Sequence, residues 1–346
     1  MNQIPGTNAL VEASGGSSEI AQRLPLGLYI AVLAWAPFPL GSNRAWAWSL
    51  LTMLVAVCWL VWGGVTWRTP QRNMLFVARY PIAATFAAAA MVWAAVQICP
   101  WAPASWAHPL WSYASQTLHQ TVPATISLNP WRSLGELLKL LTYAAALWLT
   151  YLMTLRADAA RMMLDAIIAI GAFYGFYAAV LKIFGLGQFE LFYSANPVID
   201  IYLSGPFVLH NSYATFAGLS SLAAATRLIS KGSDHIVTSR GPRPWLLSCV
   251  QFLFGSGAKF VVAFLICFST LLASASRAGA LATICGMVVM LALVTASGRK
   301  VSTRRWTGVT WALALVSLLA LTVLSGGTLG SRLKDLVDAG GIDAIR

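Results

Sequence analysis

The chain has 346 residues, of which 58% are hydrophobic and only 10% are charged; its mean hydropathy is +0.70 and its formal net charge is +12. Soluble domains carry about 25% charged residues, so this composition excludes a protein whose whole surface faces water. The basic residues are spread over short connectors and form no single patch with interleaved aromatic residues, which excludes a nucleic-acid partner. The composition predicts an all-α, polytopic integral membrane protein.

The chain begins with a polar segment, residues 1–23, that is rich in Gly and Ser and has no basic stretch. No A-x-A-like site follows the first apolar run, so we expect an uncleaved first helix and not a signal peptide. A helix needs about 20 apolar residues to cross the hydrocarbon core of a bilayer. Nine candidate helices lie near residues 24–40, 45–66, 81–100, 134–154, 162–184, 210–229, 259–275, 279–296 and 307–325.

The connectors between these runs predict the orientation of the chain. Most Lys and Arg residues fall in the N-terminal tail and in every second connector, which favours the cytoplasmic side for those segments. Residues 1–23 are then a cytoplasmic tail, residues 24–325 a transmembrane domain, and residues 326–346 the start of a periplasmic loop. The N-terminus is expected in the cytoplasm and the C-terminus in the periplasm.

The first outer connectors have two distinct features. Pro37 and Pro39 predict an irregular outer end for the first helix. The connector 101–133 is rich in Trp and Tyr, which is typical of a segment that lies in the headgroup region. His108 and His119 in this connector are minor candidates for a metal or catalytic role.

The run from Phe260 to Ser297 contains one charged residue, Arg277. As a single helix it would be about 57 Å long at 1.5 Å per residue, nearly twice the bilayer core. We therefore expect a hairpin with Arg277 near its tip, on the outer side.

Arg277 is the strongest candidate for a binding residue, because a lone guanidinium among small residues at membrane depth usually faces a cavity or a partner. Guanidinium binds phosphate through paired hydrogen bonds that Lys does not reproduce. The alternative is an Arg that ends a helix and extends to the headgroups. The sequence favours neither.

The stretch SGPFVLHNSYATFAG, residues 204–218, places His210 and Asn211 at the mouth of an apolar run. Asn211 is expected to cap the helix that begins at Ser212, and His210 is either a structural residue or a group that acts as an acid or base. A helix N-terminus on the outer side favours an anion such as phosphate.

Three further patterns are weaker. Gly171 and Gly175 form a GxxxG match of the kind that packs helices, and Glu136 and Lys139 are expected to pair at the interface. Arg332 lies in a polar stretch after the last run; it is either part of a solvated face or a further substrate-binding residue.

Three stretches of the chain resemble the O-antigen ligase and O-antigen polymerase-like integral membrane glycosyltransferases. Gly205, Phe207, Asn211 and Ala214 match the spacing of that family's G-[TP]-F-x-x-x-N-x-[FY]-A pattern. The stretch SASRAG around Arg277 is similar to the family's S-R-[GA] hairpin. The stretch SLNPWRSLGELLKLLTYAAALWL is similar to the entry into the family's fourth helix.

The resemblance implies transfer of a glycan from undecaprenyl diphosphate to lipid A–core, or to a second lipid-linked glycan in a polymerase, at the periplasmic face of the inner membrane. Arg277 would hold the donor diphosphate, with Asn211, His210 and Arg332 as further substrate-binding residues. The implied partners are the donor, the acceptor and membrane lipids, with no cofactor and no metal. The alternative from another class is a non-catalytic subunit or transporter that binds a polyprenyl-linked glycan.

The chain departs from the family at two places. Some ligases have a second Arg just before the Gly of the first motif, where this chain has Tyr202, Leu203 and Ser204. The family's large outer loop, with a His expected to activate the acceptor, would follow the last residues of this sequence. On this resemblance we expect a chain that carries the donor end of the site and lacks that His.

Overall fold

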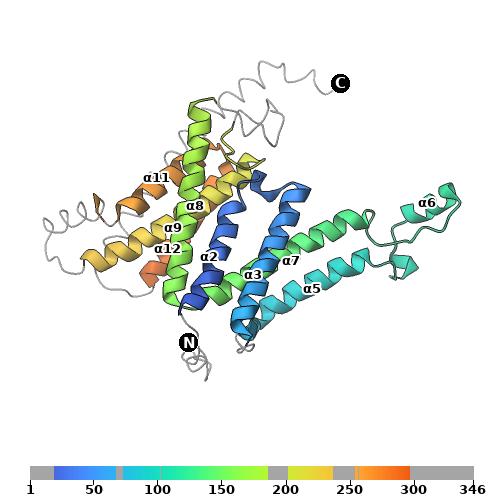
Figure 1. Ribbon diagram of the computed structural model, residues 1–346. Helices are drawn as coiled ribbons and strands as arrows, with labels where there is room; N and C mark the ends of the chain where they lie inside the picture. The colour runs from blue at the N-terminus through green and yellow to red at the C-terminus, as the bar shows by residue number, and fades with distance from the viewer. Residues whose placement is uncertain are drawn as a thin grey trace, which may run out of the picture. The chain divides into compact units, whose positions relative to one another are not determined.

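The computed structural model describes residues 19–67, 73–101, 103–185, 202–236, 254–255 and 257–296 (Figure 1). These residues form helices and connecting turns with no strand, which confirms the all-α prediction for the described part. The longer helices are α2 (Glu19–Trp35), α3 (Ala45–Thr66), α5 (Pro81–Ile98), α7 (Pro130–Met153), α8 (Ala157–Ile183), α9 (His210–Ile236), α11 (Ala258–Ala273) and α12 (Arg277–Ala296), and the shorter ones are η2 (Leu40–Ser42), α4 (Leu75–Arg79), η4 (Ala104–Trp106) and α6 (Leu110–Leu118).

Five of these helices are long and apolar enough to cross a membrane: α3, α5, α7, α8 and α12. Two shorter apolar helices are Arg23–Trp35 within α2, and α11. Helix α9 has 27 residues but is more polar, and the predicted ninth span, 307–325, lies outside the described residues. The protein is therefore a multi-pass helical membrane protein, and the number of nine spans stays a prediction.

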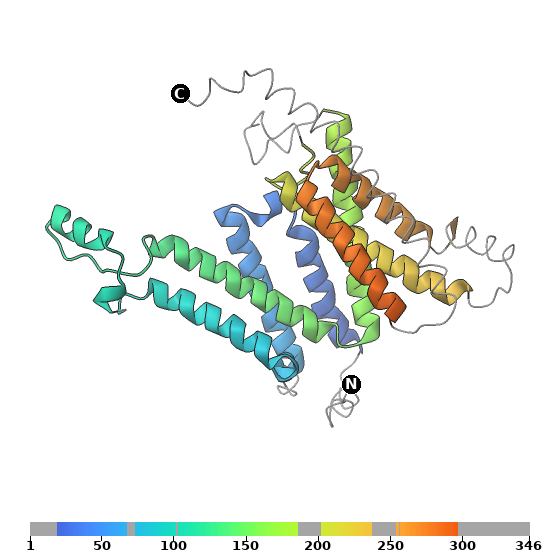
Figure 2. The ribbon, with the colours of Figure 1, turned by 180° about the vertical axis from the view of Figure 1, so that it is seen from behind.

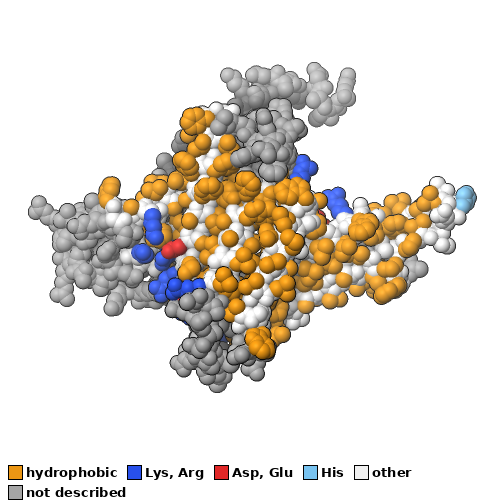
Figure 3. All heavy atoms as spheres, viewed as in Figure 1, with side chains coloured by type: hydrophobic (Ala, Val, Ile, Leu, Met, Phe, Trp, Pro, Cys, Tyr) orange, Lys and Arg blue, Asp and Glu red, His pale blue; other side chains and the backbone are white. Residues whose placement is uncertain are grey.

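The outside of the described helices is apolar. No residue of α5 is buried, and Ile82 and Phe86 on this helix are 73% and 74% exposed. Figure 3 shows hydrophobic side chains over most of the described surface on the face it presents. Such an exterior is unfavourable in water, and it suits a helix surrounded by lipid chains.

The helices form two units, which are described separately: Met1–Ala36 with Ser42–Met163, and Pro37–Gly41 with Leu164–Arg346. In the first unit α3 packs against α2 and α7, and α5 lies along α7 (Figures 1 and 2). Asn73, just before α4, joins two of these helices, because its side-chain oxygen accepts from Trp62 Nε1 at 3.0 Å and its backbone oxygen from Trp148 Nε1 at 2.9 Å.

The start of α7 contains the expected ion pair. Lys139 Nζ donates to Glu136 Oε1 at 2.9 Å and also lies 5.4 Å from the ring centroid of Trp48 on α3. Asn129 caps the same helix, since its side chain accepts from the backbone N–H of Arg132. The predicted pairing of Glu136 with Lys139 is confirmed.

The aromatic connector between α5 and α7 contains η4 and α6, which lie beyond the ends of those two helices (Figures 1 and 2). Trp101 is 90% exposed and Tyr113 is 64% exposed. His108 precedes α6, and His119 is its C-cap in the left-handed region with φ +51°. The nine-residue helix between them is about 13 Å long, so the two imidazoles are not a metal-binding pair.

In the second unit α9 packs against both α11 and α12 (Figure 2). Helix α8 packs against α9 and α11 through its two glycines, as the GxxxG pattern predicted. A Cβ on Gly171 would collide with Ser220 of α9, and a Cβ on Gly175 would lie 2.8 Å from Ile266 of α11. Glycine at both positions lets the backbones approach closely.

Three small hydroxyl side chains that are buried in this unit bond within their own helices. Ser220 and Ser221 donate to the carbonyl oxygens four residues earlier, at 2.9 and 2.8 Å, and Thr283 does the same on α12 at 2.8 Å. These residues therefore contribute small volume at the helix contacts without an unsatisfied polar group.

The turn after α2 is irregular, as Pro37 and Pro39 predicted. Leu40, Gly41 and Ser42 all have positive φ, between 54° and 64°. Gly41 contacts the ring of Phe207, since a Cβ on this glycine would lie 2.5 Å from its Cδ1. This turn therefore packs against the segment that enters α9.

Candidate functional site

The segment that enters α9 is buried and tightly turned. Leu203, Ser204, Gly205 and Pro206 are all buried, and the backbone N–H of Phe207 donates to Ser204 O at 3.0 Å. Gly205 has φ +53°, and a Cβ there would lie 3.0 Å from the ring of Tyr213. Only glycine fits both the left-handed backbone and the close approach of this ring.

Helix α9 begins at His210, where the predicted run 210–229 begins and two residues before the start that an Asn211 cap requires. Asn211 therefore lies in the first turn and is not the N-cap, so this prediction is wrong. Its side chain is exposed, and its backbone oxygen accepts from Thr215 Oγ1 at 3.1 Å. The backbone N–H groups of Ser212 and Tyr213 both reach Leu209 O at 3.1 Å, which extends the helix back to His210.

The His210 ring packs against Tyr202, with centroids 4.8 Å apart and planes 33° apart. This contact holds the imidazole at the helix entry. Sequence reasoning passed over Tyr202, which it noted only as standing where some ligases have an Arg. Tyr202 and His210 are eight residues apart, with a Gly-Pro turn between them, and no helical or strand periodicity in the sequence links the two.

The hairpin prediction is confirmed: α11 ends at Ala273, and α12 starts at Arg277. The turn between them is fixed by two serines. Ser274 Oγ donates to Leu271 O at 2.6 Å, and Ser276 Oγ accepts from the backbone N–H of Gly279 at 3.2 Å. Ser276 is therefore the N-cap of α12, and Arg277 is the first residue after it.

Ala275, at the tip of this hairpin, has φ +54°. This backbone region costs an ordinary residue about 1–2 kcal/mol, and it persists only where its surroundings require it. Both neighbouring serine side chains are buried and engaged. The turn is thus held in a strained form directly beside Arg277.

Helices α9 and α12 run in the same direction and touch through small residues. A Cβ on Gly279 would lie 2.6 Å from Ala214 Cβ, and one on Gly286 would lie 2.7 Å from Leu222. Between them Gly218 meets Thr283. Because contacts advance along both helices together, the N-termini of α9 and α12 lie at the same end of the unit.

The described residues at this end of the unit carry positive charge. Each helix contributes the positive end of its dipole, and Arg277 lies two residues before the contact with Ala214. The stretches 202–215 and 270–283 contain no Asp or Glu. Arg277 is exposed, and no carboxylate of the described residues pairs with it. The arrangement suits an anion with several acceptor oxygens.

Tyr213 is fully buried under the entry segment, in one apolar cluster with Leu203, Ala214 and Leu271. Its hydroxyl makes no hydrogen bond of standard geometry with a described residue, and Thr270 of α11 is the side chain that comes close to it. Tyr213 therefore joins the α9 entry to α11, a role that the sequence did not indicate.

The remaining predicted site residue, Arg332, lies outside the described residues. Within the described part of the chain no three His, Cys, Asp or Glu side chains form a metal-binding group.

The chain matches no protein-family model, and no curated protein or solved structure matches it. Its resemblance to the O-antigen ligase-like family therefore rests on the three stretches described above.

Proposed function

We propose that the protein transfers a glycan from an undecaprenyl-diphosphate carrier to an acceptor, such as lipid A–core, at the periplasmic face of the bacterial inner membrane. The observation that supports the proposal most is the parallel contact of α9 with α12. It brings Arg277 and the His210 turn to one end of the unit, where two helix N-termini lie side by side.

The proposed chemistry needs positive charge that is fixed before the donor arrives. Arg277 would bind oxygens of the diphosphate through paired N–H groups, and the free N–H groups at the starts of α9 and α12 would supply further donors. Charge develops on the diphosphate as the glycosidic bond breaks, so fixed donors stabilise the transition state more than the ground state. The exposed Asn211 amide and the His210 imidazole are the side chains available for the first sugar.

The proposal includes an orientation with the N-terminus in the cytoplasm. Arg156, Arg161, Arg227 and Lys231 lie near the ends of α8 and α9 that are opposite to the α9 entry, as the positive-inside rule requires. In cells, Asn211→Cys should react with a membrane-impermeant maleimide from the periplasm, and Arg161→Cys should not. The reverse labelling pattern would refute the orientation.

Donor binding is tested on the full chain in nanodiscs with undecaprenyl diphosphate as the probe. Arg277→Ala should weaken binding about 10-fold to 100-fold, since a hydrogen bond to a charged group contributes roughly 1.5–3 kcal/mol. Arg277→Lys should recover only part of the affinity, because Lys lacks the paired donor geometry. Arg132→Ala is the matched control, since Arg132 is an exposed Arg at the start of another helix. Equal binding by all variants would refute the diphosphate role.

The acceptor separates the ligase from the related alternatives. Transfer to lipid A–core in membranes identifies a ligase, and growth of a lipid-linked glycan identifies a polymerase. Binding of the donor with no transfer to either acceptor identifies a non-catalytic glycan-binding subunit or transporter. The Arg277→Ala variant should lose whichever transfer the wild-type protein performs, at unchanged protein level.

A further inference from the structure

A cluster of basic side chains surrounds one aromatic ring at the end of the second unit opposite to Arg277. The ring is Phe260, at the start of α11, and it is buried. The guanidinium carbon of Arg227 lies 5.3 Å from its centroid, Lys231 Nζ 5.5 Å and Lys259 Nζ 4.9 Å. Figure 3 shows Lys and Arg side chains gathered with an acidic group in this region of α8 and α9. We call Arg227, Lys231 and Lys259 the basic cluster.

Among the described side chains one acid, Asp165, lies against the basic cluster, and Arg227 binds both of its carboxylate oxygens. Arg227 Nε donates to Asp165 Oδ1 at 2.5 Å, and its terminal nitrogen donates to Asp165 Oδ2 at 2.9 Å. The Lys231 and Lys259 ammonium groups have no carboxylate partner among the described residues. The cation–π contacts hold both within 5.5 Å of the same centroid, so two ammonium groups gather at one ring.

The surface beside the two lysines is apolar along the helix that carries one of them. Lys259 is exposed, and Val262 and Leu265, three and six residues further along α11, are 55% and 56% exposed. A free anion would contact only the ammonium groups. A lipid would place its phosphate at the lysines and its acyl chains along Val262 and Leu265.

We propose that Lys231 and Lys259 bind the headgroup phosphate of an anionic phospholipid in the leaflet at this end of the protein. This leaflet is the cytoplasmic one in the orientation proposed above. The site is separate from the donor site, because it is formed by the C-terminal part of α9 and the N-terminal end of α11. The bound lipid neutralises the two ammonium groups and joins α9 to α11 where the loop between them begins.

The test uses the full chain purified in a neutral detergent, with phosphatidylglycerol, phosphatidylcholine and inorganic phosphate as separate probes. Native mass spectrometry counts the bound lipids, and thermal unfolding reports their stabilising effect. We expect phosphatidylglycerol to bind and to raise Tm, and the other two probes to do neither. Equal effects of phosphatidylcholine and phosphatidylglycerol, or of inorganic phosphate alone, would overturn the proposal.

Variants locate the site. Lys231→Gln with Lys259→Gln should weaken phosphatidylglycerol binding about 30-fold, which is roughly 2 kcal/mol for two lysines near an anionic headgroup. The same pair changed to Arg should keep the binding, because the charge remains. Arg161→Gln is the matched control, since Arg161 is an exposed cation one turn before Asp165 on α8. An unchanged affinity in the double Gln variant, or an equal loss in the control, would place the lipid elsewhere.

Discussion

We expect replacement of Asp165 and replacement of Arg227, which form an ion pair, to lower the stability of the protein by different amounts. The Arg227 side chain is 9% exposed and the Asp165 side chain 34%. Replacing Asp165 leaves a buried guanidinium that does not deprotonate, whereas replacing Arg227 leaves a carboxylate that water reaches. Asp165→Asn should therefore destabilise the protein more than Arg227→Met.

The magnitudes follow from burial. Breaking a buried ion pair costs about 3–5 kcal/mol, and Asn still accepts one hydrogen bond, so Asp165→Asn should cost roughly 2–3 kcal/mol. Solvent screening at a third-exposed carboxylate reduces the cost of Arg227→Met to about 1–2 kcal/mol. The double variant should cost less than the sum of the two single variants by about 1 kcal/mol or more, which measures the coupling.

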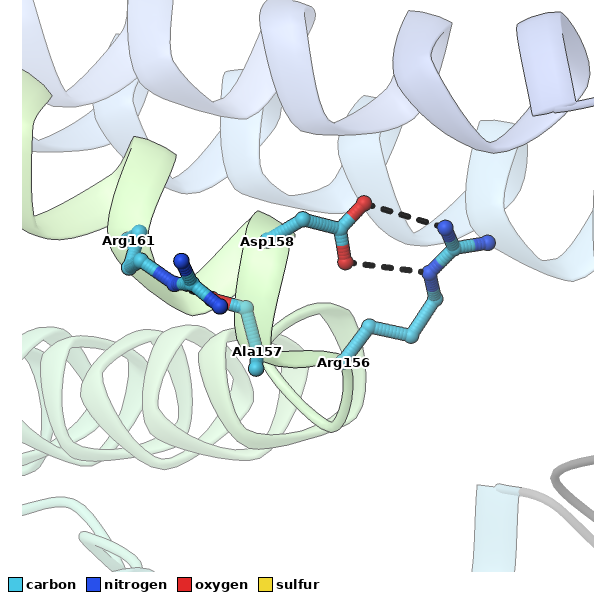
Figure 4. A network of polar contacts seen from close by, with 4 residues as sticks. All are labelled: Arg156, Ala157, Asp158 and Arg161. Atoms are coloured by element: carbon cyan, nitrogen blue, oxygen red, sulfur yellow. Dashed lines mark hydrogen bonds and ion pairs between the residues drawn. The ribbon is translucent and has the colours of Figure 1, made fainter.

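The chain contains a matched control for this experiment. Arg156 and Asp158 make the same two-point contact, with Arg156 Nε to Asp158 Oδ1 at 3.1 Å and a second bond at 3.0 Å (Figure 4). Their side chains are 40% and 59% exposed. Because geometry is similar and burial differs, Asp158→Asn should leave the free energy of unfolding unchanged within error.

The assay is equilibrium unfolding of each variant in mixed micelles, with the free energy of unfolding taken from the SDS titration. The argument from burial fails if Asp165→Asn costs no more than Arg227→Met. It also fails if Asp158→Asn costs as much as Asp165→Asn.

Three further predictions concern the backbone and helix contacts, and thermal unfolding measures each of them. Gly279→Val should destabilise the protein by about 1–3 kcal/mol through overpacking against α9, whereas Gly63→Val, where a Cβ meets open space, should have little effect; equal losses would contradict the close helix contact. Gly205→Ala should lower the free energy of unfolding by about 1 kcal/mol, and Ala275→Gly should raise it by about 1 kcal/mol, because both positions have positive φ. A change of Tm with the same sign in both variants would refute this. Asn73→Ala should lower the free energy of unfolding by about 1 kcal/mol, because it removes the acceptor of the Trp62 hydrogen bond. An unchanged Tm would show that this bond contributes nothing to stability.

The sequence predicted local features of the fold correctly where one physical limit decides them. The run 260–297 exceeds the bilayer thickness as a single helix, so a hairpin was required, and Arg277 was the one charged residue to mark its tip. The spacing of Gly171 and Gly175 correctly predicted the face of α8 on which other helices approach closely.

The boundaries and long-range pairings were beyond the sequence. Asn211 has the side chain of a good cap, but the Leu209 carbonyl starts the helix at His210 instead. Asp165 and Arg227 are 62 positions apart, and no periodicity links residues on different helices. The parallel match of Ala214 with Gly279 likewise depends on which helix faces α9, and small residues alone do not select a partner.

The pairing of Asp165 with Arg227 has a consequence for how the protein enters the membrane during synthesis. An Arg within an isolated membrane helix is unfavourable, and α9 is the most polar of the long helices in its unit. Helix α8 precedes α9 in the chain, so the acid is already in place when the Arg leaves the ribosome. The order of the two residues lets α9 find the counter-charge for Arg227 in the helix before it.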